Sequence, residues 1–260
     1  MNKNAGLFLL LLPIAYFSSA QIRIDKLELS AKQEYFIKGT DVLVIDTLIM
    51  ADSSRIILNR EKKENIINVK VGIFGRGAKI SGHGGDGDNG KSGLNGINQT
   101  APCRVGDDAG SGSNGVRGKN GLNLSLYVGS LIIKGSLIID LNGGNGGAGG
   151  NGGRGGDGGA GTRVCQGGNG GAGGLGGDGA NGGNGGNLLM TCTQCPDLHL
   201  LQDDRLFIRT YGGFAGTGAD GGAGGSAGLG PTIDGKNGSK GLPGINGEAG
   251  KRGAVNFEKK

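Results

Sequence analysis

The chain contains no tryptophan, two histidines and five prolines among its 260 residues. The histidines, His83 and His199, stand in no recognisable catalytic motif, and a Ser-His-Asp or metal assembly would depend on one of these two side chains. We therefore predict a non-enzymatic protein with no catalytic, cofactor-binding or metal-binding residues. The few prolines argue against collagen, which needs imino acids at its X and Y positions.

The sequence after residue 20 also lacks apolar residues at the 3.6-residue period of an amphipathic helix. Residues 1–20 combine Lys3, an apolar stretch from Leu7 to Phe17, and the small residues Ser18 to Ala20. This pattern predicts a secretory signal peptide that is cleaved after Ala20. A retained membrane anchor is the alternative, although the apolar stretch is shorter than the ~20 residues that a span needs. We expect no membrane span in the mature chain.

Basic residues are not concentrated in any one segment. The formal net charge is +5, and Lys and Arg are interspersed with Asp and Glu. Because nucleic-acid-binding proteins gather their basic residues on one face, we expect no nucleic acid partner. Export places the protein in the extracellular medium or at the cell surface, with the periplasm as the alternative. The expected partner is an unidentified surface ligand, matrix or glycan, and an oligomer is left open.

Glycine is abundant and periodic. Of the 63 glycines, 58 lie between Gly82 and Gly253. From Gly143 to Gly161 every third residue is glycine, and each of the first six is followed by a second glycine. A period of three matches neither the α-helix nor the β-strand, but it matches the extended left-handed threefold helix. The sequence therefore predicts a bundle of polyglycine II helices, in which glycine allows close approach of neighbouring chains.

Two other interpretations compete with the bundle. Glycine-rich sequence is usually a flexible linker, but a linker has no reason to keep a period. The segment from Gly235 to Gly253 resembles collagen in isolation, yet it holds only Pro243. We favour a bundle formed within one chain over a trimeric collagen stalk.

Three apolar regions interrupt the glycine pattern and predict strands. They are residues 21–81, 122–140 and 187–211. The second contains a tandem hexapeptide, residues 129–134 and 135–140, which is typical of solenoid-like or meandering strands. We predict an all-β fold plus a polyglycine II helical bundle, with no α-helix after the signal peptide. Residues 21–81 and the glycine-rich region 82–260 are expected to form one continuous domain.

Four cysteines in an exported protein predict two disulfides. Three pairings are open, and we favour Cys103 with Cys165 and Cys192 with Cys195, because the first pair links two breaks between glycine runs. A zinc site formed by all four is the alternative.

Two further patterns imitate known motifs. The glycine period produces G-x-G-x-x-G by itself, without the strand and helix that phosphate binding requires. Residues 152–160 and 173–181 match the calcium nonapeptide through Asp157 and Asp178, but its large apolar position holds Gly159 and Ala180.

The GGN-GGA-GGN-GGR triplets from Gly143 resemble those of known polyglycine II proteins. One group is the glycine-rich adhesins at the tail-fibre tips of T-even-like phages, whose loops bind a host receptor. The other is the springtail antifreeze proteins, disulfide-linked bundles with a flat ice-binding face. The resemblance spans about Gly82 to Gly253. The expected signal peptide does not fit a phage virion protein, and the mixed outward residues, such as Asn145, Ala148 and Arg154, differ from a uniform ice-binding row.

We therefore expect a secreted, non-enzymatic protein that acts as a rigid scaffold for adhesion or structural assembly. Ice binding is the first alternative. A glycan-binding module is the second, with its site on the loops Asn98 to Asp108, Thr162 to Gln166 and Thr193 to Asp197. The sequence identifies no ligand, and the binding residues are unknown.

Overall fold

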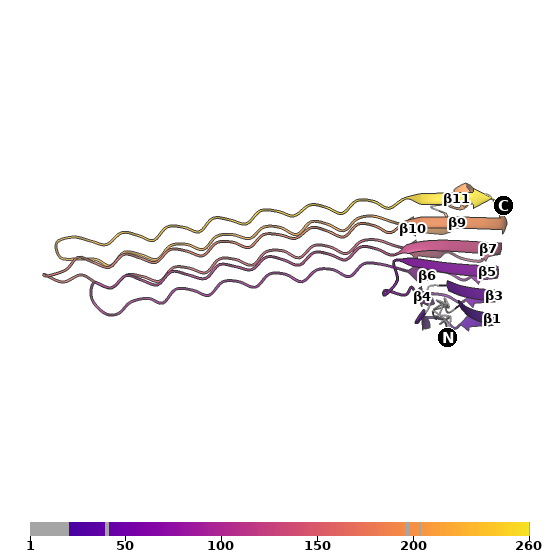
Figure 1. The fold of residues 1–260 in the computed structure, drawn as a ribbon, viewed down its shortest axis with the longest axis horizontal. Helices are drawn as coiled ribbons and strands as arrows, with labels where there is room; N and C mark the ends of the chain where they lie inside the picture. The colour runs from indigo at the N-terminus through magenta and orange to yellow at the C-terminus, as the bar shows by residue number, and fades with distance from the viewer. Residues whose placement is uncertain (1–20, 40–41, 196–197, 203, 260) are drawn as a thin grey trace, which may run out of the picture.

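The computed structural model describes residues 21–39, 42–195, 198–202 and 204–259. The signal peptide expected at residues 1–20 lies outside these residues. The described chain consists of a base, made of two β-sheets, and a stem of extended glycine-rich segments that leaves one side of the base (Figure 1).

Odd-numbered strands form a six-stranded sheet in the order β1-β3-β5-β7-β9-β11, and even-numbered strands form a five-stranded sheet in the order β10-β8-β6-β4-β2. The first sheet comprises β1 (Gln21–Leu29), β3 (Val42–Met50), β5 (Glu64–Phe74), β7 (Asn123–Ile133), β9 (Leu188–Gln194) and β11 (Val255–Lys259). The second comprises β2 (Glu34–Phe36), β4 (Arg55–Ile57), β6 (Ala78–Ser81), β8 (Leu137–Asp140) and β10 (Leu206–Arg209).

All neighbouring strands in both sheets are parallel. Because consecutive strands alternate between the two sheets, the chain winds as a solenoid whose coils add one strand to each sheet. The all-β expectation is confirmed, and the sheets are parallel throughout the described residues. One four-residue turn of helix, α1 (Leu198–Leu201), lies between β9 and β10 and departs from the expectation of no helix.

The apolar core lies between the two sheets. Alternation along each strand sends every second side chain inward, and the parallel register stacks these side chains on successive coils. Two such rows are nearly or fully buried: Leu43, Ile67, Leu126 and Met190 in the first sheet, and Ile56, Ile80, Ile139 and Ile208 in the second. Burial of these rows is the main source of apolar stabilisation in the base.

The tandem hexapeptide belongs to this solenoid, as expected, but its two copies do not pair with each other. Residues 129–134 lie at the end of β7 and just beyond it, whereas residues 135–140 lead into and form β8. The second copy pairs instead with β6 and β10.

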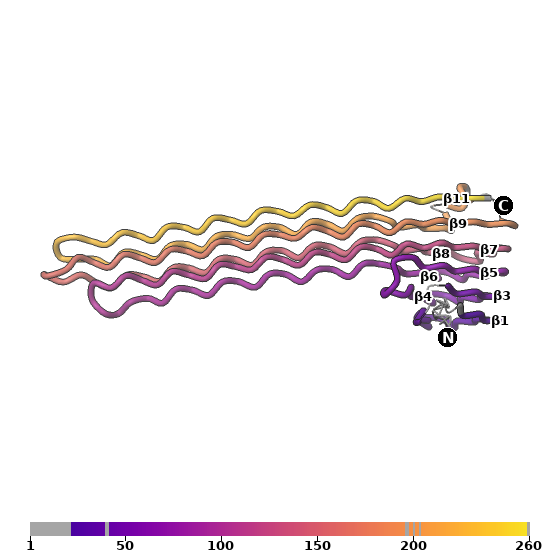
Figure 2. The backbone as a smooth tube through the Cα atoms, viewed as in Figure 1, coloured from indigo at the N-terminus to yellow at the C-terminus, as the bar shows by residue number. Residues whose placement is uncertain are grey.

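Three glycine-rich excursions replace the short turns between coils. They are residues 82–122 after β6, 141–187 after β8 and 210–254 after β10. Each excursion runs out from the base and returns beside itself (Figure 2). We call residues 82–96, 141–160 and 210–228 the outgoing segments, and residues 106–122, 167–187 and 235–254 the returning segments.

Backbone hydrogen bonds join the outgoing segments into one layer and the returning segments into a second. The sheet ladder of the base runs on into the stem, since the Gly82 N–H donates to the Asp140 carbonyl and the Gly84 N–H to the Asn142 carbonyl, both at 2.8 Å. The base therefore sets the register of the stem.

The number of glycines per triplet follows the number of neighbouring segments. In the central segment 141–160, the first glycine of each triplet donates within its own layer and the second donates to the other layer. Gly149 N–H, for example, donates to Thr217 and Gly150 N–H to Ser113, each at 2.9 Å. Segment 235–254 lies at an edge and uses one glycine per triplet toward segment 210–228. This edge position explains why the segment resembles collagen.

Glycine is required in the stem because segments approach through their backbones. A Cβ at Gly152 would contact the Gly174 carbonyl oxygen and would lie 2.7 Å from the Gly222 nitrogen. Neither backbone atom can move aside as a flexible side chain would. Any larger residue must therefore separate the segments.

Asparagine and aspartate at the third position of the triplet cap the next segment in the same layer. The third residue points outward, so its N–H faces no backbone carbonyl. The Asn145 side chain accepts the Phe214 N–H at 2.9 Å, and the Asn184 side chain accepts the Lys251 N–H at 2.9 Å. Both hydrogen bonds lie at exposed positions, so each cap adds the modest net stabilisation of an intramolecular hydrogen bond to the contact between segments.

The last segment of each layer has no further segment in its own layer to cap, and asparagine and aspartate are scarce at its third positions. Segment 210–228 carries Tyr211, Phe214, Thr217, Asp220, Ala223 and Ser226 there, and segment 235–254 carries Lys236, Ser239, Leu242, Ile245, Glu248 and Lys251. The scarcity of asparagine and aspartate at the third position thus marks the last segment of each layer in the described stem.

We predict that Gly152→Val lowers the free energy of unfolding by at least about 2 kcal/mol, because the new side chain overpacks a backbone contact. Ala223→Val adds comparable bulk at an exposed third position and should change stability by less than about 0.5 kcal/mol. Chemical denaturation followed by circular dichroism measures both. Equal effects would contradict the close approach of segments at Gly152.

We also predict that Asn184→Ala costs about 0.5 to 1.5 kcal/mol of stability and accelerates amide exchange at Lys251, because it removes the acceptor of that N–H. Asn184→Asp keeps an acceptor and should retain most of the stability at neutral pH. The control Lys251→Ala leaves the backbone bond intact. If the alanine and aspartate variants of Asn184 were equally unstable, the capping role would be wrong.

Candidate binding surface at the tip of the stem

Three connections meet at the end of the stem that is remote from the base (Figures 1 and 2). Each joins an outgoing segment to its returning segment. We call residues 97–105, 161–166 and 229–234 together the tip. The connections are far apart in the sequence, and the stem brings them side by side.

A disulfide links the first two connections. Cys103 pairs with Cys165, with their Cα atoms 6.1 Å apart, in the pairing that the sequence favoured. The Cys103 N–H donates to the Ala160 carbonyl at 2.8 Å, and Cys103 has a left-handed φ of 64°. A non-glycine residue such as Cys103 keeps a left-handed conformation where its surroundings hold it. The Thr162 N–H donates to the Cys165 carbonyl at 2.9 Å and closes the second connection.

The third connection is tied to the second by backbone hydrogen bonds. Gly161 N–H donates to the Leu229 carbonyl at 2.8 Å, and Gly167 N–H to the Ile233 carbonyl at 3.0 Å. Within the third connection, the Asp234 carboxylate accepts the Gly230 N–H at 2.8 Å. The tip is therefore a bonded structure rather than three independent loops.

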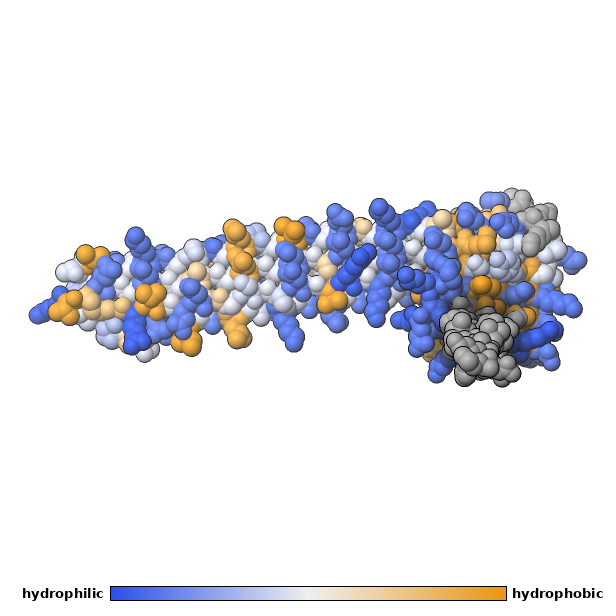
Figure 3. Space-filling model, viewed as in Figure 1, coloured by the Kyte–Doolittle hydropathy of each residue, from blue (hydrophilic) through white to orange (hydrophobic). Residues whose placement is uncertain are grey.

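Large apolar side chains are exposed on all three connections. Their exposed fractions run from 56% for Val105 to 93% for Val164. The set is Ile97, Val105, Val164, Leu229 and Ile233. Figure 3 shows apolar residues in orange near this end of the stem, next to hydrophilic residues in blue. Clustered exposed apolar residues commonly mark an interaction site.

Acidic and basic side chains at and near the tip differ in their contacts. Just beyond the tip, the Asp107 carboxylate accepts a hydrogen bond from the Gln99 amide at 3.0 Å, and the Asp108 carboxylate accepts the Ala172 N–H at 2.6 Å. In contrast, Arg104 and Arg163 are exposed and form no ion pair with any described residue. The tip therefore offers two guanidinium groups to a partner.

The structure unites only some of the loops proposed from the sequence. Loops Asn98 to Asp108 and Thr162 to Gln166 meet at the tip, linked by the disulfide. Thr193 and Gln194 belong to β9, whose end points away from the tip, and residues 196–197 lie outside the described chain (Figure 1). Connection 229–234 was missed. Pro231, which interrupts the glycine pattern, is the sequence signal that marks it.

The second cysteine pair lies in the base. Cys192 in β9 pairs with Cys195, with their Cα atoms 5.9 Å apart. His199 on α1 stacks edge-to-face on Phe257, with ring centroids 5.0 Å apart. His83 is half-buried at the start of segment 82–96. The two histidines therefore lie in different surroundings and do not form a common site.

The aspartates of the calcium-like nonapeptides cap backbone N–H groups. Asp157 accepts the Ser226 N–H at 2.7 Å and pairs with Arg154 at 2.6 Å, whereas Asp178 accepts the Ile245 N–H at 2.9 Å in the other layer. The Ser226 N–H, followed by the Arg154 guanidinium, holds the pKa of Asp157 below its usual value. Both carboxylates thus have structural partners.

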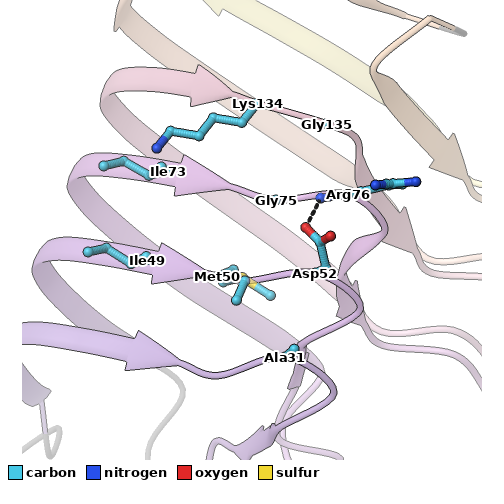
Figure 4. Close-up of a pocket in the computed structure, with 10 residues that line it drawn as sticks. Ala31, Ile49, Met50, Asp52, Ile73, Gly75, Arg76, Lys134 and Gly135 are labelled. Atoms are coloured by element: carbon cyan, nitrogen blue, oxygen red, sulfur yellow. Dashed lines mark hydrogen bonds between the residues drawn. The ribbon is translucent and has the colours of Figure 1, made fainter.

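The base has an open cavity of about 490 Å³ at the turns that lead from β3, β5 and β7 into the second sheet (Figure 4). Asp52 in its wall accepts the Arg76 N–H at 2.8 Å. Figure 4 shows the Lys134 and Arg76 side chains extending in opposite directions. The cavity therefore does not gather convergent polar groups of the kind that fix a small ligand, and the tip is the better candidate.

Comparisons with known proteins add little to this geometry. No family model and no curated protein matches the chain. A solved springtail antifreeze protein from Granisotoma rainieri, described as a bundle of nine polyproline type II helices, is 24% identical over 61% of this chain and 94% of its own. Its TM-score is 0.10, so the match carries no structural argument.

Within the described residues, no helix has the length and apolar character needed to cross a bilayer. The one helix that the structure describes, α1, has four residues.

We predict that replacing Cys103 and Cys165 by serine loosens the tip. The bridge closes a separation of 62 residues, and its loss should cost about 2 to 4 kcal/mol of stability. Amide exchange followed by mass spectrometry should become faster in peptides of the first two connections and stay unchanged in the buried rows of the base. Unchanged exchange at the tip would mean that the backbone bonds alone hold it.

Proposed function

We propose that this protein is a secreted, non-enzymatic scaffold for adhesion or structural assembly at a cell surface or in the extracellular space, with the tip as its binding end. The observation that carries the proposal is the convergence of three connections on one exposed, disulfide-linked end of a hydrogen-bonded stem. Recognition commonly resides on loops that a rigid support holds in place.

We further infer that the stem is a polyglycine II bundle. Its N–H groups donate sideways to neighbouring segments with a three-residue repeat, and this supports the interpretation. At the ~3.1 Å rise of such a helix, a segment of about 20 residues would hold the tip roughly 60 Å from the base. A spacer of this length suits a protein that presents a binding end away from its attachment.

Two features of the chain support secretion, namely its cysteine pairs and its expected signal peptide. Both cysteine pairs are at disulfide distance, which is compatible with an oxidising compartment. The expected signal peptide would deliver the protein to such a compartment.

Ice binding remains the alternative, although the outward rows do not favour it. A flat ice-binding face would require small, uniform residues. The outward row of segment 141–160 instead includes Arg154 and Asp157, and the neighbouring row includes Tyr211 and Phe214.

The proposal predicts that mature protein binds whole cells, immobilised matrix protein or arrayed glycans through the tip. The double variant Val164→Ala and Ile233→Ala should weaken binding about tenfold or more, as truncation of central contacts does in other interfaces. The matched double variant Leu242→Ala and Ile245→Ala removes similar exposed side chains from the stem and should keep binding within about twofold.

Thermal hysteresis at millimolar protein separates adhesion from ice binding in the same preparation. We expect none. A clear hysteresis gap that Ala148→Tyr removes and the tip variant leaves intact would overturn the adhesion scaffold.

A further inference from the structure

Exposed apolar side chains are denser at the tip than elsewhere in the described chain. Fourteen large apolar residues are exposed, and five of them lie within the three short connections of the tip. Seven others are spread along the much longer stem, where triplets with polar third residues separate many of them. Most stem side chains point outward because backbone fills the interior, with Leu141, Thr210 and Ala219 as buried exceptions, but this does not explain the concentration at the tip.

The five tip residues are all aliphatic. Protein interfaces centre on aromatic and arginine anchors, whereas leucine and valine are under-represented at their energetic centres. A glycan presents hydroxyl groups, which need hydrogen-bond partners when they leave water. Aliphatic side chains such as Val164, Leu229 and Ile233 provide none. These aliphatic side chains suit a partner whose apolar interior lies beneath a polar surface layer.

The electrostatics of the tip indicate the charge of that partner. Within the tip, the charged residues are Arg104, Arg163 and Asp234, so positive charges outnumber negative ones there by two to one. Asp107 and Asp108 lie just beyond the tip and, like Asp234, accept a hydrogen bond within the chain while keeping their negative charge. Arg104 and Arg163 form no ion pair among the described residues, are exposed, and directly precede Val105 and Val164 in the sequence. Basic residues that flank apolar ones are the combination that attracts a segment to anionic lipid and then buries its apolar surface at the acyl boundary.

The tip is also held in shape before it meets a partner. The Cys103–Cys165 disulfide joins two connections, and the Gly161 and Gly167 N–H groups hold the third. A preorganised surface loses little conformational freedom on binding. Shallow insertion therefore needs no refolding of the tip.

We propose that the tip docks on an anionic lipid bilayer. The side chains of Val164, Leu229 and Ile233, on the two connections that reach furthest (Figure 1), enter the boundary between headgroups and acyl chains, while Arg104 and Arg163 contact lipid phosphates. This rests on the proposed function, in which the tip is the binding end. It adds the chemistry of the partner.

The test is flotation of disulfide-intact residues 21–260 with vesicles. Vesicles of about three parts phosphatidylcholine to one part phosphatidylglycerol should bind the protein about tenfold more tightly than pure phosphatidylcholine, and raising the salt from about 0.1 M to about 0.5 M should remove most of that difference. Arg104→Gln with Arg163→Gln should abolish the preference for anionic lipid.

Matched aspartate variants locate the contact. Val164→Asp with Ile233→Asp should reduce binding to the anionic vesicles about tenfold or more, because charge is expelled from the acyl boundary. Leu242→Asp with Ile245→Asp places the same charges on the stem and should bind within about twofold of the unmodified protein. Circular dichroism and gel filtration check that each variant is folded, and Val164→Ser with Ile233→Ser provides an uncharged variant of the same site.

The outcomes distinguish this inference from the function on which it rests. Absence of vesicle binding, together with tip-dependent binding to cells, matrix or glycans, would overturn the lipid assignment and leave the scaffold function standing. Equal losses from the tip and stem variants would overturn both. Complete competition by millimolar glycerol phosphate would show that a free phosphate suffices, and would also overturn docking on a bilayer.

Discussion

An extended glycine chain cannot satisfy its backbone hydrogen-bonding groups by itself, and the architecture of this protein follows from that constraint. Each stem segment donates its N–H groups sideways to segments that the chain has brought alongside. The base makes this arrangement stable, because its parallel coils hold the beginning and end of every excursion in register. Apolar burial is concentrated in the base, whereas the stem interior consists of backbone. The two parts therefore perform different tasks within one hydrogen-bonded ladder.

The sequence predicted the ordered glycine segments and the strand regions better than it predicted their arrangement. The glycine period indicates an extended chain with neighbours, and β-branched runs indicate strands. The strand pairing was not predictable, since Ile67 lies beside Leu126 across the whole excursion of residues 82–122 and nothing in either strand alone specifies that partner. Asn145 and Asn184 could be identified as outward residues, but their capping role depends on an N–H that the next segment supplies.

The candidate site was also predictable only in part, because breaks in the glycine pattern are visible in the sequence but their arrangement in space is not. Cys103 and Cys165 mark breaks in the glycine pattern, so their loops and pairing could be inferred from the sequence. The third connection begins with Leu229, between Gly228 and Gly230, so the glycine pattern is interrupted only briefly there. Thr193 was grouped with the other loops because the direction of β9 is not encoded in its residues. The exposure of Val164 depends on where the stem ends and not on its neighbours in sequence.

Because each excursion runs out from the base and returns, its length sets how far the tip lies from the base. The second excursion, residues 141–187, extends beyond the first, residues 82–122, so the far end of the molecule is stepped (Figure 1). A triplet inserted in one segment alone would move its glycines away from their present carbonyls, whereas triplets added to both segments of every excursion would give each new donor an acceptor. The reach of the binding end can thus be altered in steps of three residues, while the folded base that determines the alignment stays the same.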